Sequence, residues 1–196
     1  AGGLSIHILI VLPSVFYLLT GINPRKHFSA MASALATAFS TSSSNATLPV
    51  TIRCVENNAG VSNKISSFVL PMGATINMDG TSLYQAVAAV FIAQAFGMDL
   101  SFGVQLGIIA TATLASIGSA AVPGAGMVML VIVLAQAGIP EAGLALIFAI
   151  DRPLDMCRTT VNVTGDATVC TIIADGENML DYHDTKNPTE TFDLDS

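Results

Sequence analysis

The 196-residue sequence contains no tryptophan, and only 11% of its residues are charged. Soluble domains usually carry about 25% charged residues, whereas this chain is 52% hydrophobic and has a mean hydropathy of +0.67. Its seven basic residues are too few and too scattered for the basic surface that nucleic-acid binding requires. The composition therefore favours a membrane protein and argues against a nucleic acid as partner.

The sequence also lacks an ordered cysteine pattern. Cys54, Cys157 and Cys170 are odd in number and show no C-x-x-C spacing, so neither a disulfide framework nor a zinc site is indicated. The first residues include neither an initiator methionine nor a charged leader. We expect free thiols and a chain that begins inside a longer protein. Residues 175–196 hold seven of the fourteen acidic residues, which predicts a solvated, disordered tail.

A polar stripe runs through the last apolar segment. Asp151, Asp155, Arg158, Asn162 and Asp166 recur every three or four residues and would share one helix face. Charges inside a membrane cost about 2.5–3.5 kcal/mol each and mark ion or substrate pathways. A soluble core with satisfied ion pairs is the alternative, but three aspartates against one arginine leave an acidic excess that needs a cation. We expect a transmembrane helix over 139–174 that carries a substrate site.

The remaining segments predict spanning and half-length helices. Residues 1–24 form one transmembrane helix, and 63–97 form a second that is broken by Asn77-Met-Asp-Gly-Thr81. Unwound backbone at mid-membrane is where transporters bind sodium. Residues 25–62 and 98–138 each contain two half-length apolar runs around a polar or glycine-rich tip, which indicates two re-entrant hairpins. A soluble serine-rich turn is the alternative for the first.

The two hairpins differ in their flanking charges and in their tips. Basic residues flank the first hairpin but not the second, so the tips should approach one site from opposite faces of the membrane. The second tip, 116–126, is rich in glycine and is the better candidate for a gate.

Four motifs resemble the dicarboxylate/amino acid:cation symporter family, the glutamate transporters. They are Asn77-Met-Asp-Gly-Thr81, the serine-rich tip ending in Ala-Thr-Leu-Pro49, the tip Ala-Val-Pro-Gly-Ala-Gly126, and Asp155-x-x-Arg-Thr-x-x-Asn-Val-x-Gly-Asp166. The resemblance covers residues 4–174. It implies an all-α, multi-pass protein of the plasma or inner membrane, not an enzyme, that works as a homotrimer in the lipid bilayer by an elevator movement. The chain matches only the part from the sixth family helix onward.

The resemblance implies an acidic amino acid as substrate. Arg158 would pair with its side-chain carboxylate, for which a guanidinium is a bidentate partner. Asp155 would hold the α-ammonium, with Thr159 and Asn162 nearby for the ammonium and the α-carboxylate. Further carboxylate contacts would come from both tips and from one hydroxyl: Ser43, Ser44, Thr81, Val122, Pro123, Gly124 and Gly126.

The resemblance further implies two to three co-transported sodium ions, held by oxygen ligands that suit a hard cation. The first would take carbonyls of Gly73, Asn77 and Asn162 with the Asp166 carboxylate. The third would take the side chains of Asn77 and Asp79, with residues from an earlier helix. The second would lie beside Met78 and take backbone oxygens of Thr75, Ser116, Ile117 and Ser119.

Specificity rests on three of these positions. Family members for neutral amino acids lack an arginine at the Arg158 position, and C4-dicarboxylate members carry serine and asparagine at the Asp155 and Asp166 positions. Both remain alternatives, as does a truncated fragment that does not transport. Members usually have a further arginine in the first tip or directly after Asp155. Here Ser42 and Met156 stand there, and Arg152 is the candidate substitute, which leaves potassium coupling open.

Two enzymatic readings compete with transport. Intramembrane aspartyl proteases use paired carboxylates in Gly-x-Gly-Asp and Tyr-Asp motifs, while this chain has Val-Thr-Gly-Asp166 and Met-Asp-Gly80. An amidase-type serine nucleophile lacks the surrounding glycines and the paired lysine near Ser42. Both readings are weaker than the transporter reading.

Overall fold

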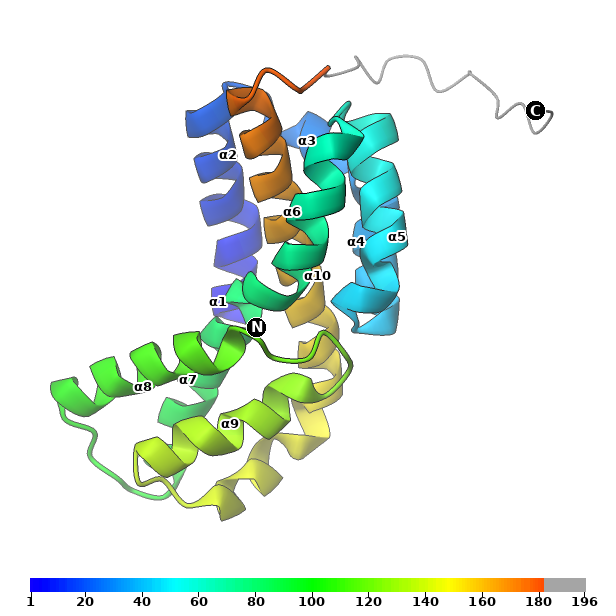
Figure 1. Cartoon of the computed structure of the whole chain (residues 1–196). Helices are drawn as coiled ribbons and strands as arrows, with labels where there is room; N and C mark the ends of the chain where they lie inside the picture. The colour runs from blue at the N-terminus through cyan, green and yellow to red at the C-terminus, as the bar shows by residue number, and fades with distance from the viewer. Residues whose placement is uncertain (182–196) are drawn as a thin grey trace.

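The computed structural model describes residues 1–181. Over this range the chain is helical, and its β structure is limited to one isolated bridge, which confirms the all-α class. In chain order the helices are α1 (Gly2–Ile6), the π-helix η1 (His7–Val11), α2 (Leu12–Thr20), α3 (Pro24–Ala30), α4 (Ala32–Thr41), α5 (Ser44–Arg53), the π-helix η2 (Cys54–Asn58), α6 (Asn63–Ile76), α7 (Asp79–Ala95), α8 (Phe102–Ser116), α9 (Ala125–Gln136), the 3-10 helix η3 (Glu141–Gly143) and α10 (Leu144–Gly176) (Figure 1).

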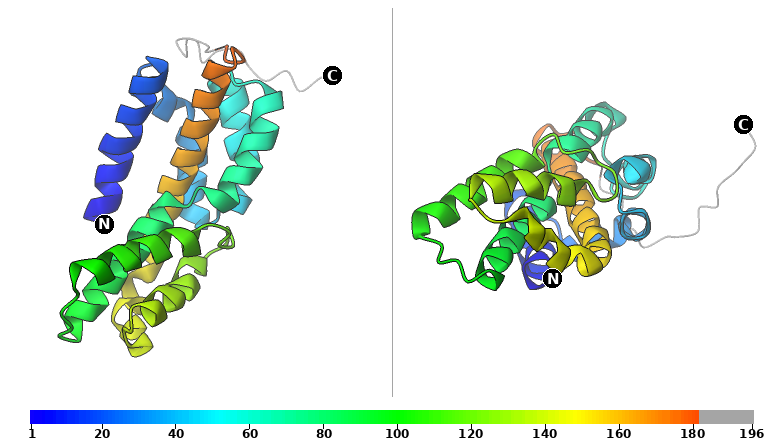
Figure 2. Two further views of the ribbon diagram at one scale, coloured as in Figure 1. Left: turned by 60° about the vertical axis from the view of Figure 1, so that its left-hand side comes forward. Right: turned by 90° about the horizontal axis from the view of Figure 1, so that it is seen from below.

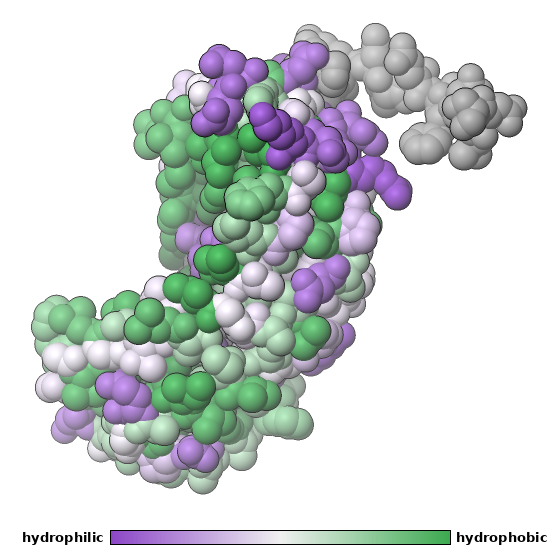
Figure 3. All heavy atoms as spheres, viewed as in Figure 1, coloured by the Kyte–Doolittle hydropathy of each residue, from purple (hydrophilic) through white to green (hydrophobic). Residues whose placement is uncertain are grey.

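The first three helices follow one another without a break and form one apolar run, Gly2–Thr20. Its mean hydropathy is 2.0, and among the residues described it is the one helical run long and apolar enough to cross a membrane. Leu9 and Leu18 are 70% and 79% exposed, so the run presents apolar side chains outward. Figure 3 shows hydrophobic residues along this side of the molecule and over α8.

Two helix pairs turn back on themselves. Hairpin 1 consists of α4 and α5, and only Ser42 and Ser43 separate its helices. Ser42 adopts a left-handed conformation with φ of 52°, and the Ser43 hydroxyl caps α5 by accepting from the Ala46 amide at 3.1 Å. Hairpin 2 consists of α8 and α9, joined by the eight residues 117–124. The entry of both hairpins into a membrane stays a prediction.

The chain between the hairpins breaks where the sequence has its polar interruption. Helix α6 ends at Ile76 and α7 begins at Asp79, while Asn77 and Met78 have non-helical backbone angles. The break covers two residues, because Asp79, Gly80 and Thr81 already belong to α7. It turns the chain from one part of the molecule into the other (Figures 1 and 2).

Two hydrophobic cores meet at this break. The first lies among α4, η2, α6 and the later half of α10, with Met31, Val55, Leu70 and Cys170 buried in it. The second lies among α7, α8, α9 and the earlier half of α10, with Tyr84, Ile92, Ile108, Leu130 and Leu134 buried in it. Helix α10 runs through both, so its middle turns lie between the cores. The polar stripe is carried by these turns.

The segment after α10 corrects one expectation. Residues 175 and 176 complete α10, and the chain then turns back so that Leu180 forms an antiparallel bridge with Val61. The predicted disorder is therefore wrong for 175–181, because backbone hydrogen bonds and the apolar Leu180 side chain hold this part against the first core. The rest of the predicted tail, 182–196, lies outside the described residues.

Candidate functional site

A small cavity lies where both hairpin tips meet the middle of α10. Its volume is about 20 Å³, which is room for roughly one water molecule. The two tips are therefore closed over a site that is too small, in this conformation, for an amino acid. The cavity is lined by Ser42, Ser44, Met78, Thr81, Ser119, Ala120, Ala121, Val122, Ala125, Gly126, Asp155, Thr159 and Asn162.

Arg158 is the most deeply buried charged group beside this cavity, with 1% of its surface exposed. Its Nη2 lies 2.8 Å from Asp155 Oδ1 and 3.4 Å from Asp151 Oδ1. Its Nη1 and Nε are buried and have no hydrogen-bond partner. Buried donors without partners are uncommon and carry a desolvation penalty. Nη2 is thus held by carboxylates, whereas Nη1 and Nε carry buried donors without a hydrogen-bond partner.

Tyr84 of α7 supports the guanidinium from its face. The Arg158 Cζ atom lies 3.9 Å from the centre of the Tyr84 ring, a distance at which a cation is attracted by the ring. The Tyr84 hydroxyl donates to Asp151 Oδ1 at 2.8 Å. Ring, hydroxyl and carboxylate together fix the orientation of Arg158.

Asp155 connects α10 to the tip of hairpin 2. Its Oδ2 accepts a hydrogen bond from the Gly124 amide at 2.8 Å. Arg152 Nη1 lies 3.9 Å from the same oxygen, and its side chain is 58% exposed. The proposed substitute arginine is thus near Asp155, but at a distance and exposure where an ion pair is weak.

The two tips also bond to each other. The Ser43 hydroxyl donates to the Ala121 carbonyl oxygen at 2.7 Å, and the Asn45 amide donates to the same oxygen at 3.3 Å. Ser44 is buried and lines the cavity with Val122. Of the predicted tip contacts, Ser44, Val122 and Gly126 line the cavity, whereas Ser43, Pro123 and Gly124 are not among its lining residues.

Asn162 joins α10 to the start of α7. Its Oδ1 accepts from the Gly80 amide at 2.8 Å, and its Nδ2 donates to the Thr81 hydroxyl at 3.0 Å. The neighbouring Thr159 is buried and lines the same cavity. Of the predicted substrate residues, the structure places Thr81, Asp155, Thr159 and Asn162 on the α7 and α10 side of this cavity.

The residues predicted for the first sodium ion lie one turn further along α10. Asp166 is buried, and its Oδ1 accepts from Asn77 Nδ2 at 3.0 Å. A Cβ atom added at Gly73 would lie 2.7 Å from the same oxygen. Gly73 thus brings the α6 backbone close to a buried carboxylate beside the helix break. An acidic oxygen next to backbone carbonyls is a donor set that suits sodium.

The residues predicted for the second ion lie between the α6 end and hairpin 2. The Thr75 carbonyl oxygen accepts from the Gly118 amide at 2.8 Å. Ser116 and Ser119 are buried, and the Ser119 hydroxyl has no partner. Ile117 is partly exposed, whereas Met78 is buried and lines the cavity. The proposed ligand Thr75 is therefore occupied by the hairpin itself in the closed form.

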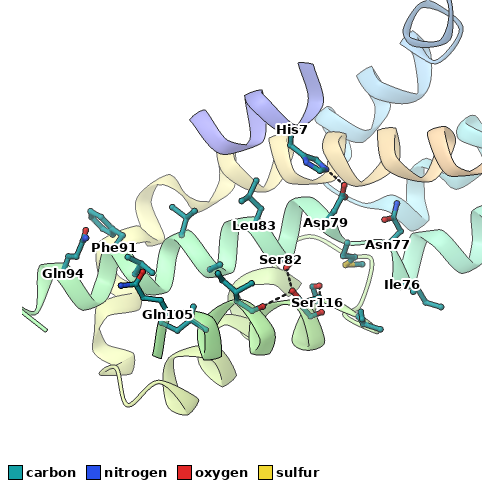
Figure 4. A pocket seen from close by; sticks show the side chains of 18 residues that line it. His7, Ile76, Asn77, Asp79, Ser82, Leu83, Phe91, Gln94, Gln105 and Ser116 are labelled. Carbon is teal, nitrogen blue, oxygen red and sulfur yellow. Dashed lines mark hydrogen bonds and ion pairs between the residues drawn. The ribbon is translucent and has the colours of Figure 1, made fainter. Parts of the chain in front are cut away.

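Asp79, predicted for the third ion, contacts His7 of η1. The His7 Nε2 atom hydrogen-bonds Asp79 Oδ2. Both line a wider pocket of about 920 Å³ between α7, α8 and η1, and Figure 4 shows their side chains pointing toward each other. Asn77 and Ser116 lie on the wall of the same pocket.

Sequence reasoning missed two contributors to the site, Tyr84 and Gln85, because both lie in an apolar helix pattern. Gln85 is fully buried and donates from Nε2 to the Gly126 carbonyl oxygen at 3.1 Å. A buried glutamine inside an apolar helix was the one signal available for this residue, because buried polar groups need partners.

Comparison with known proteins supports the resemblance. Residues 1–175 match the model of the sodium:dicarboxylate symporter family. The chain belongs to the sodium:dicarboxylate symporter family. Excitatory amino acid transporter 1 of Rattus norvegicus is 51% identical over 185 residues, which cover 94% of this chain and 33% of the relative. Excitatory amino acid transporter 3 of Mus musculus is 57% identical over 165 residues, covering 84% of this chain and 32% of the relative.

A relative from Caenorhabditis elegans, named excitatory amino acid transporter, is 50% identical over 183 residues, covering 93% of this chain and 36% of the relative. The chain thus spans about a third of the length of these relatives. Membership of the symporter family confirms the expected membrane location. The relatives are named as transporters, and the family name gives sodium as the coupled ion.

Proposed function

We propose that this chain forms the substrate-binding part of a sodium-coupled symporter for acidic amino acids such as glutamate and aspartate. The observation that carries the proposal is the buried Arg158, whose Nη2 is held by two carboxylates while Nη1 and Nε lack partners. A substrate carboxylate would give the unpaired Nη1 of Arg158 a charge-assisted hydrogen bond.

Asp155 distinguishes an amino acid from a plain dicarboxylate. Its Oδ2 bonds the Gly124 amide in the closed, empty form, and a substrate ammonium would take the place of this amide. A C4-dicarboxylate has no cation to offer, so it would face a buried carboxylate without compensation. A neutral amino acid would satisfy Asp155 but leave Nη1 of Arg158 unpaired.

Sodium coupling is supported by two oxygen positions that the closed form fills with its own donors, one from hairpin 2 and one from the α6–α7 break. Thr75 accepts from Gly118, and Asp166 accepts from Asn77. Ions at these positions would replace the two hydrogen bonds, and the ion at Thr75 would release the Gly118 amide of hairpin 2. We propose two to three ions, a homotrimeric parent in the lipid bilayer, and an elevator movement, all on the family resemblance.

The test is uptake of radiolabelled L-aspartate into proteoliposomes that hold the full-length parent, with an inward sodium gradient. We expect Arg158→Ala to lose acidic substrates by at least about a hundredfold, because a buried charged pair loses one partner. Arg152→Ala is the matched control and should keep most of the uptake. Sodium-independent uptake, or unchanged uptake by Arg158→Ala, would contradict the proposal.

A second variant separates substrate from ion. Asp166→Asn removes the carboxylate at the proposed first sodium position without changing the shape of the side chain. We expect the sodium concentration for half-maximal uptake to rise at least about tenfold, while the preference for acidic over neutral amino acids stays. Uptake of succinate or L-serine by the unmodified parent, in preference to L-aspartate, would favour the alternative substrates.

A further inference from the structure

The segment that follows α10 fastens the base of hairpin 1. After the end of α10 the chain reverses at Asn178, which has a φ of 55°, and the Met179 amide donates back to Ala174 O at 2.8 Å. The next residues run antiparallel to 60–62, the corner between η2 and α6. Figure 1 shows the end of α10 beside the start of α6.

Two hydrogen bonds flank the bridged pair Val61 and Leu180. The Ser62 amide donates to Met179 O at 3.1 Å, and the Asp181 amide donates to Gly60 O at 2.8 Å. This is the non-hydrogen-bonded pair of an antiparallel ladder, in which the side chains lie closest. Leu180 packs against the first core, to which the buried Val61 belongs.

We propose that residues 177–181 form a clasp that keeps hairpin 1 fixed to α10 while hairpin 2 opens and closes. The corner held by the clasp is continuous with α5 through η2, because Val61 donates to Val55 O at 3.1 Å. Movement of hairpin 1 away from α10 would have to break these backbone bonds and expose Leu180. The motion of hairpin 2 rests on the proposed function, whereas the clasp itself does not.

The first experiment measures the clasp without transport. In the full-length parent, a chain ending after Gly176 is compared with one ending after Asp181, and hydrogen exchange is followed by mass spectrometry. We expect exchange over residues 59–66 to be at least tenfold faster in the shorter chain, with exchange over 117–124 unchanged. Equal exchange over 59–66 in the two chains would overturn the proposal.

A point variant guards against a general loss of folding. Asp181→Pro removes the amide that donates to Gly60 O and also fixes the φ of residue 181, while Asp181→Ala keeps this amide and loses the same carboxylate. We expect faster exchange over 59–66 with proline and not with alanine. The same rise with both variants would show that the backbone bond has no such role.

The second experiment tests whether the clasp stays closed during turnover. A Val61→Cys, Leu180→Cys variant places two thiols at a bridge position whose Cα atoms are about 4.5 Å apart in such pairs, within the range for a disulfide. Oxidation should leave sodium-driven uptake within twofold of the reduced protein. Inhibition that dithiothreitol reverses, and that Val61→Cys alone does not show, would overturn the proposal. No uptake in the unmodified parent would instead count against the proposed function.

Discussion

Hairpin 1 and hairpin 2 reach the same cavity with tips of different construction. Hairpin 1 turns in two residues, and the Ser43 hydroxyl caps its own second helix. Hairpin 2 takes eight residues to turn, with Gly118 and Gly124 both at positive φ. A short capped turn has few other conformations, whereas a long turn with glycines has many.

The hydrogen bonds that hold the hairpin 2 tip also make its position depend on other parts of the molecule. Hairpin 2 is held at Thr75 O, at the Ser43 hydroxyl and at Asp155 Oδ2, and each of these partners belongs to another element. The partners are also atoms that we assign to substrate or sodium. Ligands would therefore compete with the closed empty tip for the same atoms. The comparison teaches that hairpin 2 is the tip whose position depends on what is bound.

The largest expected effect comes from joining the tips. The hydrogen bond from Ser43 Oγ to Ala121 O brings the two tips into contact in the closed form, so a Ser43→Cys, Ala121→Cys pair is the cross-link to test under oxidant. We expect oxidation to abolish sodium-driven uptake and dithiothreitol to restore it, since hairpin 2 could no longer open. The two single variants under the same oxidant are the controls. Full uptake in the cross-linked protein would show that entry does not require the tips to separate.

A methyl group at Gly126 should have the next largest effect. Its Cβ would lie 2.9 Å from Arg158 Nη1, so either the start of α9 or the guanidinium must move. We expect Gly126→Ala to lower the apparent affinity for L-aspartate about tenfold or more. A tenfold loss of affinity corresponds to about 1.4 kcal/mol of binding free energy. Gly103→Ala, in the other helix of hairpin 2 with its nearest contact at 4.0 Å, should leave the affinity unchanged.

Strain at the hairpin 2 tip should have a smaller effect. Gly118 has a φ of 77°, and an alanine in this conformation costs about 1–2 kcal/mol. We expect Gly118→Ala to weaken L-aspartate binding about fivefold by favouring the open tip. Gly97→Ala, with a φ of 68° in the loop after α7, should lower the thermal midpoint without changing affinity. Equal affinity losses in both variants would remove the special role of the tip.

The smallest effect is expected at the hairpin 1 tip. Ser42 occupies a left-handed conformation, so Ser42→Gly relieves backbone strain while adding freedom to the unfolded chain. The relieved strain and the added freedom of the unfolded chain nearly cancel, and we expect a shift of the thermal midpoint of about two degrees or less. Because Ser42 lines the cavity, uptake should change, but by less than with Gly118→Ala. A change of uptake as large as that of Gly118→Ala would erase the difference between the tips.

Sequence patterns predicted the parts of this molecule that depend on local chemistry. The break at Asn77 and Met78 lies at the start of the predicted interruption, whose Asn, Asp and Gly residues disfavour a helix, and the stripe on α10 follows from spacing alone. Residues such as Asp155 and Arg158 stood out because charge is rare in this chain. Their contact at 2.8 Å joins residues three apart on one helix. Helical periodicity predicts such contacts, because residues three or four apart share a helix face.

The rest of the site depends on contacts between distant segments. Tyr84 meets Asp151 across 67 positions and Asp79 meets His7 across 72, so no local pattern contains either pair. Tyr84 and His7 also have side chains that occur in ordinary apolar helices. The order of residues 177–181 was missed because their acidic and polar composition is typical of a disordered tail. The contacts that hold them come from one leucine and from backbone hydrogen bonds, which composition does not show.

Four glycines lie so close to polar side chains of the site that they should not tolerate substitution. Added methyl groups at Gly73, Gly80, Gly126 and Gly165 would lie within 3.0 Å of Asp166, Asn162, Arg158 and Asn77, respectively. Each polar side chain thus occupies space that only a missing Cβ leaves free. A scan of alanine substitutions across the chain should find these four positions as sensitive as the charged residues beside them. The positions of these glycines would then mark the location of the site, although glycine itself has no side chain that could bind a ligand.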